Sequence, residues 1–138
     1  MIDRTVIYKA LSKHLYNNFS VANSVAWENV DFDKAGRAVW LKEVFAPNDT
    51  EQFTIGSTGK IRDFGFYRIN VYIPTGQGTF ASNTYINELS QLYKHGIVLT
   101  KDNYDIIIDK ATPNAGFESD GWWVTPFTID WSCYMAIN

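Results

Sequence analysis

The sequence contains little cysteine and histidine, and this shortage limits its chemistry. Cys133 is the only cysteine among 138 residues, so no disulfide can form within the chain, which is consistent with a reducing cytosol. His14 and His95, the only histidines, belong to two separate predicted helices, so no zinc-ligand cluster is evident. We expect neither a metal ion nor any other cofactor.

Long apolar runs are also missing. No stretch approaches the ~18 apolar residues that a membrane-spanning helix needs, and we expect no membrane contact. Residues 1–19 carry charged and polar side chains at short intervals, unlike a signal peptide. The net charge of −3 does not indicate a basic surface that coats DNA, although a protein could surround DNA without gripping it.

The usual catalytic motifs are absent as well. The glycines of Gly56–Lys60 are separated by two residues instead of four, and Ile61 follows the lysine, so we reject a phosphate-binding loop. No G-x-S-x-G elbow is present, and Cys133 falls on the predicted inward face of a strand, where a free cysteine is normally a small core residue. We expect that the protein is not an enzyme.

Three aspartates lie close together in the sequence, namely Asp102, Asp105 and Asp109. The EF-hand pattern and its central glycine are missing, so a calcium site is not favoured. The simpler interpretation is the solvated face of a short strand.

Aromatic residues, by contrast, are abundant. They make up 16% of a chain whose length fits a single domain, residues 1–138. Some are expected at a contact surface, where Trp and Tyr are favoured. A β core rich in Trp and Tyr remains the simpler interpretation for any single residue.

The apolar pattern predicts an α+β fold: two amphipathic helices packed on one face of a mostly antiparallel sheet, with an extended hairpin-like arm. The helices are expected at residues 3–19, capped by Asp3, and at residues 79–95, followed by a left-handed cap at Gly96. Strands are expected at residues 38–45, 65–73, 97–99, 104–109 and 122–135.

Two prolines and one turn-like segment are expected to limit or interrupt these strands. The segment Ala46–Asp49 is expected to form a turn that closes the strand at residues 38–45, and Pro74 should end the strand at residues 65–73. Pro126 argues for an edge position or a bulge near the start of the last strand.

The arm is the most distinctive feature of the sequence. Gly56 and Gly59 make it mobile, and its charged end contains Lys60, Arg62 and Asp63. One interpretation is a solvated, mobile loop. The other is an arm, residues 53–63, that becomes ordered against a neighbouring subunit through Phe53, Lys60, Arg62 and Asp63.

An ordered series of segments resembles the phage tail-terminator-like family, over roughly residues 1–100. An N-terminal amphipathic helix is followed by Val25–Asn29, Trp40–Leu41, Phe45–Pro47, Ile55–Gly56 with Gly59 and Arg62, Gly65–Val71, and Pro74–Gly78 leading into a helix.

This resemblance implies a structural virion assembly protein without cofactors. Such a subunit forms a homo-oligomeric ring, typically a hexamer, at the head-proximal end of the tail. The ring caps the tail tube, stops its polymerisation and offers a surface to the head-completion protein, while DNA passes through without specific binding. The expected location is the virion tail, with assembly in the host cytoplasm.

Two alternatives remain open from the sequence. The chain could be another head–tail connector or neck protein, or a small aromatic-rich binding module that uses Trp122, Trp123 and Trp131. Trp122 and Trp123 are adjacent in a predicted strand, so they should point to opposite faces and cannot form one platform.

Overall fold

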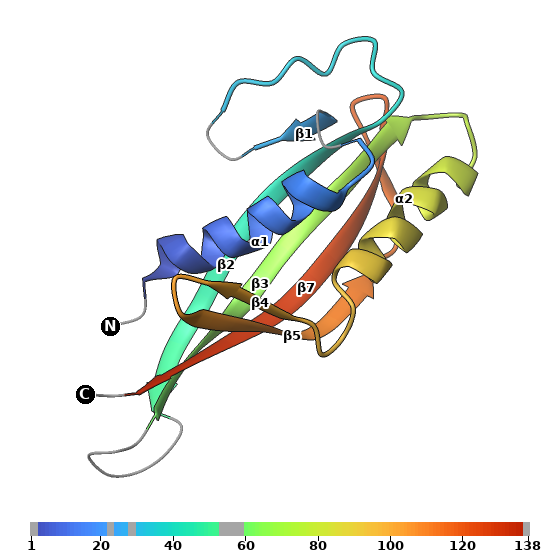
Figure 1. Ribbon diagram of the computed structural model, residues 1–138. Helices are drawn as coiled ribbons and strands as arrows, with labels where there is room; N and C mark the ends of the chain where they lie inside the picture. The colour runs from blue at the N-terminus through green and yellow to red at the C-terminus, as the bar shows by residue number, and fades with distance from the viewer. Residues whose placement is uncertain (1–2, 22–23, 28–29, 53–59, 137–138) are drawn as a thin grey trace.

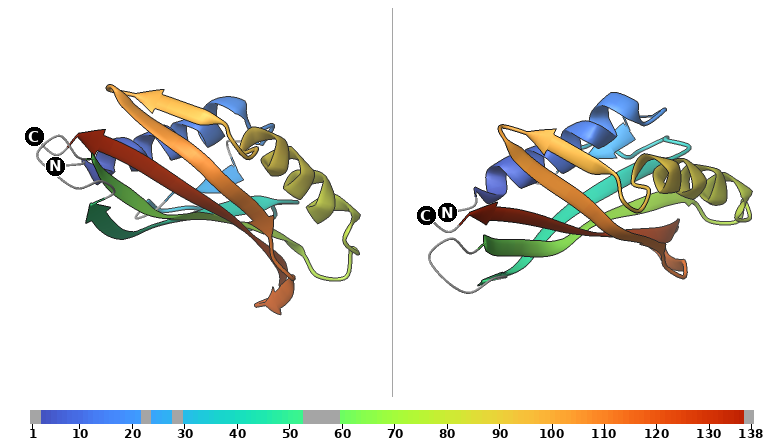
Figure 2. Two further views of the ribbon diagram at one scale, coloured as in Figure 1. Left: turned by 90° about the horizontal axis from the view of Figure 1, so that it is seen from below. Right: turned by 60° about the horizontal axis from the view of Figure 1, so that its bottom comes forward.

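The computed structural model describes residues 3–21, 24–27, 30–52 and 60–136. These residues form two helices and one seven-stranded sheet, which confirms the α+β class (Figure 1). The sheet curls into a half-barrel (Figure 2). Its strand order is β1-β2-β3-β7-β5-β4, with β6 paired to β7 beside this path. The strands are β1 (Val25–Ala26), β2 (Trp40–Gln52), β3 (Lys60–Pro74), β4 (Val98–Lys101), β5 (Tyr104–Pro113), β6 (Phe117–Ser119) and β7 (Trp122–Ala136).

Helix α1 (Arg4–Asn18) begins where the sequence predicts. The Asp3 carboxylate accepts a hydrogen bond from the Thr5 backbone N–H at 2.9 Å, which satisfies one of the free donors at the start of the helix. The helix buries Ile7, Leu11 and Leu15 completely. Burial of each such side chain contributes about 1.5–3 kcal/mol, so packing of this apolar stripe is what holds the helix in place.

Helix α2 (Phe80–Leu92) is shorter than predicted. Leu89 and Tyr93 of the predicted apolar stripe are fully buried, and the Tyr93 hydroxyl donates to the Leu11 carbonyl at 2.7 Å. The predicted cap at Gly96 is displaced, because the helix already ends at Leu92 with Tyr93 as its C-cap. Gly96 has φ +86° and instead turns the chain towards β4, with its N–H bonded to the Ile108 carbonyl.

Strand β3 shows the predicted alternation. Its odd-numbered residues Tyr67, Ile69, Val71 and Ile73 are fully buried, and we call their side of the sheet the core face. The even-numbered residues lie on the opposite side, which we call the outer face. Both helices and the core-face residues of β2, β3, β5 and β7 contribute to a single hydrophobic cluster. Helix α1 contacts β4, β5 and β2, whereas α2 contacts β3, β5 and β7, so the two helices share β5 and otherwise meet different strands.

The predicted turn at Ala46–Asp49 is wrong. Strand β2 continues to Gln52, and the Pro47 region forms an irregularity between Pro47 and Thr50 in its pairing with β3. Proline cannot donate to a ladder, and a register shift lets the strand continue past it. The composition that predicts a turn here therefore marks a bulge inside a strand.

The charged end of the arm is likewise not a mobile loop. Lys60 and the residues up to Asp63 belong to β3, and this segment pairs with β2 on one side and with β7 on the other. Phe53, with the rest of residues 53–59, lies outside the described residues.

Pro126 does not place its strand at an edge or at a bulge. Strand β7 lies between β3 and β5, and its register with β3 is continuous past Asn70↔Pro126. The Pro126 carbonyl accepts a hydrogen bond from the Asn114 N–H at 2.8 Å, so this carbonyl faces the β5 side of the strand. Pairing with β5 stops at Pro113↔Phe127, and the missing proline donor therefore falls where the ladder has ended.

Within the described part of the chain, neither helix is long and apolar enough to span a membrane. The same residues contain no group of three or more His, Cys, Asp or Glu side chains placed to hold a metal ion.

Candidate assembly surface

The outer face of β3 carries two pairs of neighbouring basic and aromatic side chains. The Arg62 guanidinium lies 4.4 Å from the Phe64 ring centroid, and the Arg68 guanidinium lies 5.2 Å from that of Phe66. Each such contact contributes about 0.5–1 kcal/mol at an exposed site and holds the long basic side chain against the sheet. The strand thus presents two pre-positioned cations on one face.

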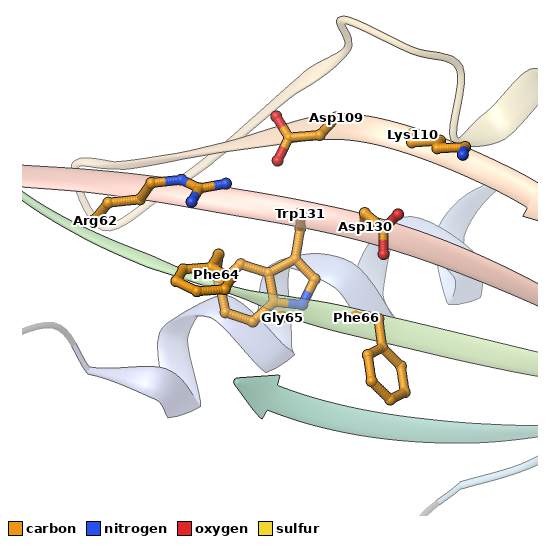
Figure 3. A pocket seen from close by; sticks show the side chains of 8 residues that line it. All are labelled: Arg62, Phe64, Gly65, Phe66, Asp109, Lys110, Asp130 and Trp131. Atoms are coloured by element: carbon orange, nitrogen blue, oxygen red, sulfur yellow. The ribbon is translucent and has the colours of Figure 1, made fainter. Parts of the chain in front are cut away.

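A shallow depression of about 400 Å³ lies beside these residues (Figure 3). It gathers side chains from β3, β5 and β7, namely Arg62, Phe64, Gly65, Phe66, Asp109, Lys110, Asp130 and Trp131. The Asp109 carboxylate is held by a hydrogen bond from the Ser132 hydroxyl at 3.0 Å. Two basic and two acidic groups share the depression, so it offers no single-sign field for a polyanion such as DNA. Mixed charges and aromatic rings suit a protein contact.

The core face of the same strand contains a fully buried carboxylate, Asp63. The Arg4 guanidinium of α1 donates to both of its oxygens, from Nε at 3.2 Å and from Nη2 at 3.3 Å. Arg62 and Asp63 are adjacent in sequence but lie on opposite faces of β3, because side chains alternate along a strand.

The structure therefore divides the predicted contact set. Arg62 reaches the outer face, Asp63 is engaged inside the subunit, and Lys60 begins β3 with its backbone opposite Ala136. The outer-face partners Phe64, Phe66 and Asp130 were missed by the sequence analysis. The period-two alternation of β3 was the signal for Phe66 and, continued towards the first residue of the strand, for Phe64. Asp130 lies on β7 opposite Phe66, a pairing that no local pattern specifies.

A second buried carboxylate, Glu43 of β2, lies in the core between two tyrosines. It is fully buried and accepts hydrogen bonds from the Tyr8 hydroxyl of α1 and the Tyr67 hydroxyl of β3. Burial raises the pKa of Tyr67 well above its ordinary value of 10.0, and the nearby Tyr93 and Glu43 raise it further. Burial also raises the pKa of Tyr93, again with Glu43 as the next cause. These two hydroxyls therefore stay protonated and act as donors: Tyr67 links β3 to β2, and Tyr93 links the end of α2 to α1. The bond from Tyr8 to Glu43 ties α1 to the sheet.

Cys133 occupies the core, as predicted. It is fully buried on β7, and burial, followed by Asp63 and Asp105, raises the pKa of its thiol to about 11. A thiol with such a pKa is protonated at neutral pH and is a weak nucleophile.

Trp122 and Trp123 occupy opposite faces of β7, as predicted. Trp122 packs edge-on against Trp40 of β2 at a centroid distance of 5.8 Å, and Trp40 stacks on Tyr72 at 3.8 Å. Trp123 instead packs against the hydrophobic core. The two indoles do not form a shared binding platform.

The domain thus combines a curled sheet and two helices. Its outer face carries paired arginine–aromatic contacts, and its core contains two buried carboxylates. The model of the phage tail terminator protein family matches residues 6–131, which places the chain among the structural proteins of phage tails. The chain belongs to the phage tail terminator protein family, and it is a component of the virion tail.

The fold also occurs among solved structures, fifteen of whose chains match. One of them has a TM-score of 0.77 and 19% sequence identity to this chain, and the match covers 96% of each chain. At this identity the likeness concerns the fold. No curated protein matches the chain significantly.

Proposed function

We propose that the chain is a ring-forming tail terminator, which caps the tail tube, stops its polymerisation and provides the surface to which the head joins. The observation that carries this proposal is the match to the tail terminator family over residues 6–131, which is nearly the whole domain. The chain works by steric capping and has no enzymatic step.

Its proposed partners are other copies of itself in a ring, most simply a hexamer, together with the tail-tube protein and the head-completion protein. The ring sits at the head-proximal end of the tail and assembles in the host cytoplasm. DNA passes through it without specific binding. The net charge of −3 and the mixed charges beside Arg62 support this passive role, because a DNA-gripping surface would be strongly basic.

We further propose that the end of the β2–β3 hairpin is an assembly contact, through Phe53, Lys60 and Arg62. Arg62 is already held over Phe64, so less conformational entropy is lost when it meets a neighbouring subunit. Asp63 contributes indirectly, because its ion pair with Arg4 fixes this part of β3 against α1.

Particles assembled without this chain test the proposal. Loss of a terminator should give overlong or headless tails, visible by negative-stain electron microscopy, and wild-type protein supplied in trans should restore normal particles. Normal tails beside leaky heads would instead identify a head-side connector and refute the capping role.

A further inference from the structure

Two strands of the sheet have an edge available for pairing. Strand β4 pairs with β5 on one side, and β6 pairs with β7 on one side, and in the described part of the chain no strand lies along their other edges. The free edge of β2 is different, because β1 covers its start and Pro47 and the adjoining irregularity interrupt it further along. Such features protect an edge from pairing with another chain.

A groove runs between helix α1 and the free edge of β4. Its volume is about 330 Å³, and its polar lining comes from Lys13, His14, Asn17 and Asn18 of α1 and from Thr100 and Lys101 of β4. No carboxylate lines this groove. Two acidic residues of the β4–β5 hairpin lie outside this lining: Asp102 follows Lys101 in the turn, and Asp105 accepts a hydrogen bond from the Thr100 hydroxyl at 2.9 Å. The groove is therefore a basic site in a chain of net negative charge.

The hairpin that contains β6 has the complementary properties. All three of its strand residues are exposed, and Phe117 exposes 50% of its surface. Glu118 and Asp120 give the hairpin negative charge, and no ion pair within the described residues involves either of them. A hydrogen bond from the Thr75 N–H to the Gly121 carbonyl, at 3.0 Å, connects the hairpin to the end of β3.

Strands β4 and β6 also carry matching kinds of side chain on corresponding faces. The register places Val98 of β4 opposite Ile107, and Phe117 of β6 opposite Val124, both on the outer face. Val98 is 51% exposed, so it is, like Phe117, a large apolar side chain exposed to solvent. Lys101 and Glu118 lie on the opposite side, since each is an odd number of residues away from the outer-face residue of its strand.

We propose that β6 of a second copy adds to the free edge of β4 and fills the groove beside α1. With the two outer faces kept on the same side, Phe117 covers Val98, and Glu118 meets Lys101 and Lys13. Backbone hydrogen bonds between the strands supply affinity, and the apolar and charged pairs fix the register. The contact joins two different surfaces of the chain, as head-to-tail association requires, and so rests on the proposed ring.

Cysteine cross-linking tests this pairing directly, because the native Cys133 is buried and its thiol is unreactive. Tagged Val98→Cys and untagged Phe117→Cys chains are mixed in the presence of tail tubes and oxidised. The mixed dimer should be the main product. The matched control pairs Tyr16→Cys with Phe117→Cys, because Tyr16 is 60% exposed on α1. In this control the mixed dimer should not be the main product.

Charge reversal provides a second, independent test of the pairing. Lys101→Glu and Glu118→Lys should each weaken association by about tenfold or more, because like charges then meet, and the double variant should recover most of the loss. Asp120 is left unchanged because its φ of +49° disfavours lysine. Absence of both the mixed dimer and the rescue overturns the inference. If the wild-type chain still caps tubes in that case, the proposed function stands without it.

Discussion

Arg4 and Asp63 join the first turn of α1 to the sheet, and they lie 59 residues apart in sequence. The carboxylate is fully buried, whereas the arginine side chain is 44% exposed. Two parallel hydrogen bonds hold the pair, a geometry that is stronger and more specific than a single contact.

Arg4→Ala should therefore lower the free energy of unfolding by about 2 kcal/mol, since it leaves a buried carboxylate without this partner. The partial exposure of Arg4 keeps the loss below that of a fully buried pair. Urea denaturation followed by circular dichroism measures the change. Lys9→Ala, an exposed substitution on the same helix, is the control and should stay within about 0.5 kcal/mol. Equal behaviour of both variants would show that the pair contributes no stability.

Tyr67→Phe tests the buried Glu43 cluster. The variant removes a donor to a fully buried carboxylate and should cost about 1.5–3 kcal/mol of unfolding free energy. Tyr16→Phe removes a hydroxyl from a side chain that is 60% exposed and should be nearly neutral. A neutral Tyr67→Phe in the same urea titration would contradict the anchoring role given to Glu43.

Alkaline pH should destabilise the protein through Cys133. The pKa of its thiol is about 11 in the folded chain, against an ordinary 9.0, so the unfolded chain loses this proton first. The stability contribution is complete below pH 9 and is lost as pH rises towards 11, a change of about 2 kcal/mol. Tyr67 and Tyr93, whose pKa values lie well above 10.0, add to the loss above pH 10. Cys133→Val should flatten the pH dependence between pH 9 and 10, and an unchanged slope there would refute the assignment to the thiol.

Gly116→Ala should disturb the indole of Trp123. A Cβ at this position would lie 2.5 Å from Trp123 Nε1, closer than real Cβ atoms approach. The expected cost is about 1–3 kcal/mol, with a shift in tryptophan fluorescence as the ring moves. Ala115→Ser changes the neighbouring exposed residue and should alter neither quantity. An unperturbed spectrum for Gly116→Ala would mean that the indole has room to move without cost.

The two arginines on the outer face of β3 allow a matched test of the assembly contact. Arg62→Ala, alone or with Lys60→Ala, should impair ring formation on tube ends. Its unfolding free energy should change by about 1 kcal/mol or less, because it loses one cation–π contact. Arg68→Ala loses the corresponding contact with Phe66 and a long hydrogen bond to the Thr128 hydroxyl at 3.4 Å, and it should assemble normally. Equal assembly by both variants would remove Arg62 from the interface.

The elements that were predicted well are those whose sequence pattern is local and regular. Asp3 and the spacing of Ile7, Leu11 and Leu15 define α1, and the alternation from Tyr67 to Ile73 defines the core face of β3. The failures occur where tertiary pairing overrides local composition. Pro47 and its neighbours resemble a turn, but pairing with β3 carries the strand past them.

The candidate surface was predictable only in part, for a similar reason. Arg62 and Asp63 were grouped because they are adjacent and charged, whereas their positions in a strand separate them. The partner of Asp63 is Arg4, and the partners of Glu43 are Tyr8 and Tyr67. Such pairings depend on how α1 lies against the sheet, which no local pattern specifies. The buried position of Glu43 did have a signal, because it shares the parity of Leu41 in an alternating strand.

The length of tail tubes tests the central claim most directly. Purified chain is titrated into tail-tube subunits during polymerisation, and tube lengths are measured by electron microscopy. A terminator predicts that growth stops, with shorter tubes as its concentration rises and a ring visible at one end of each tube. An unchanged length distribution at saturating protein, with bare tube ends, would contradict the account.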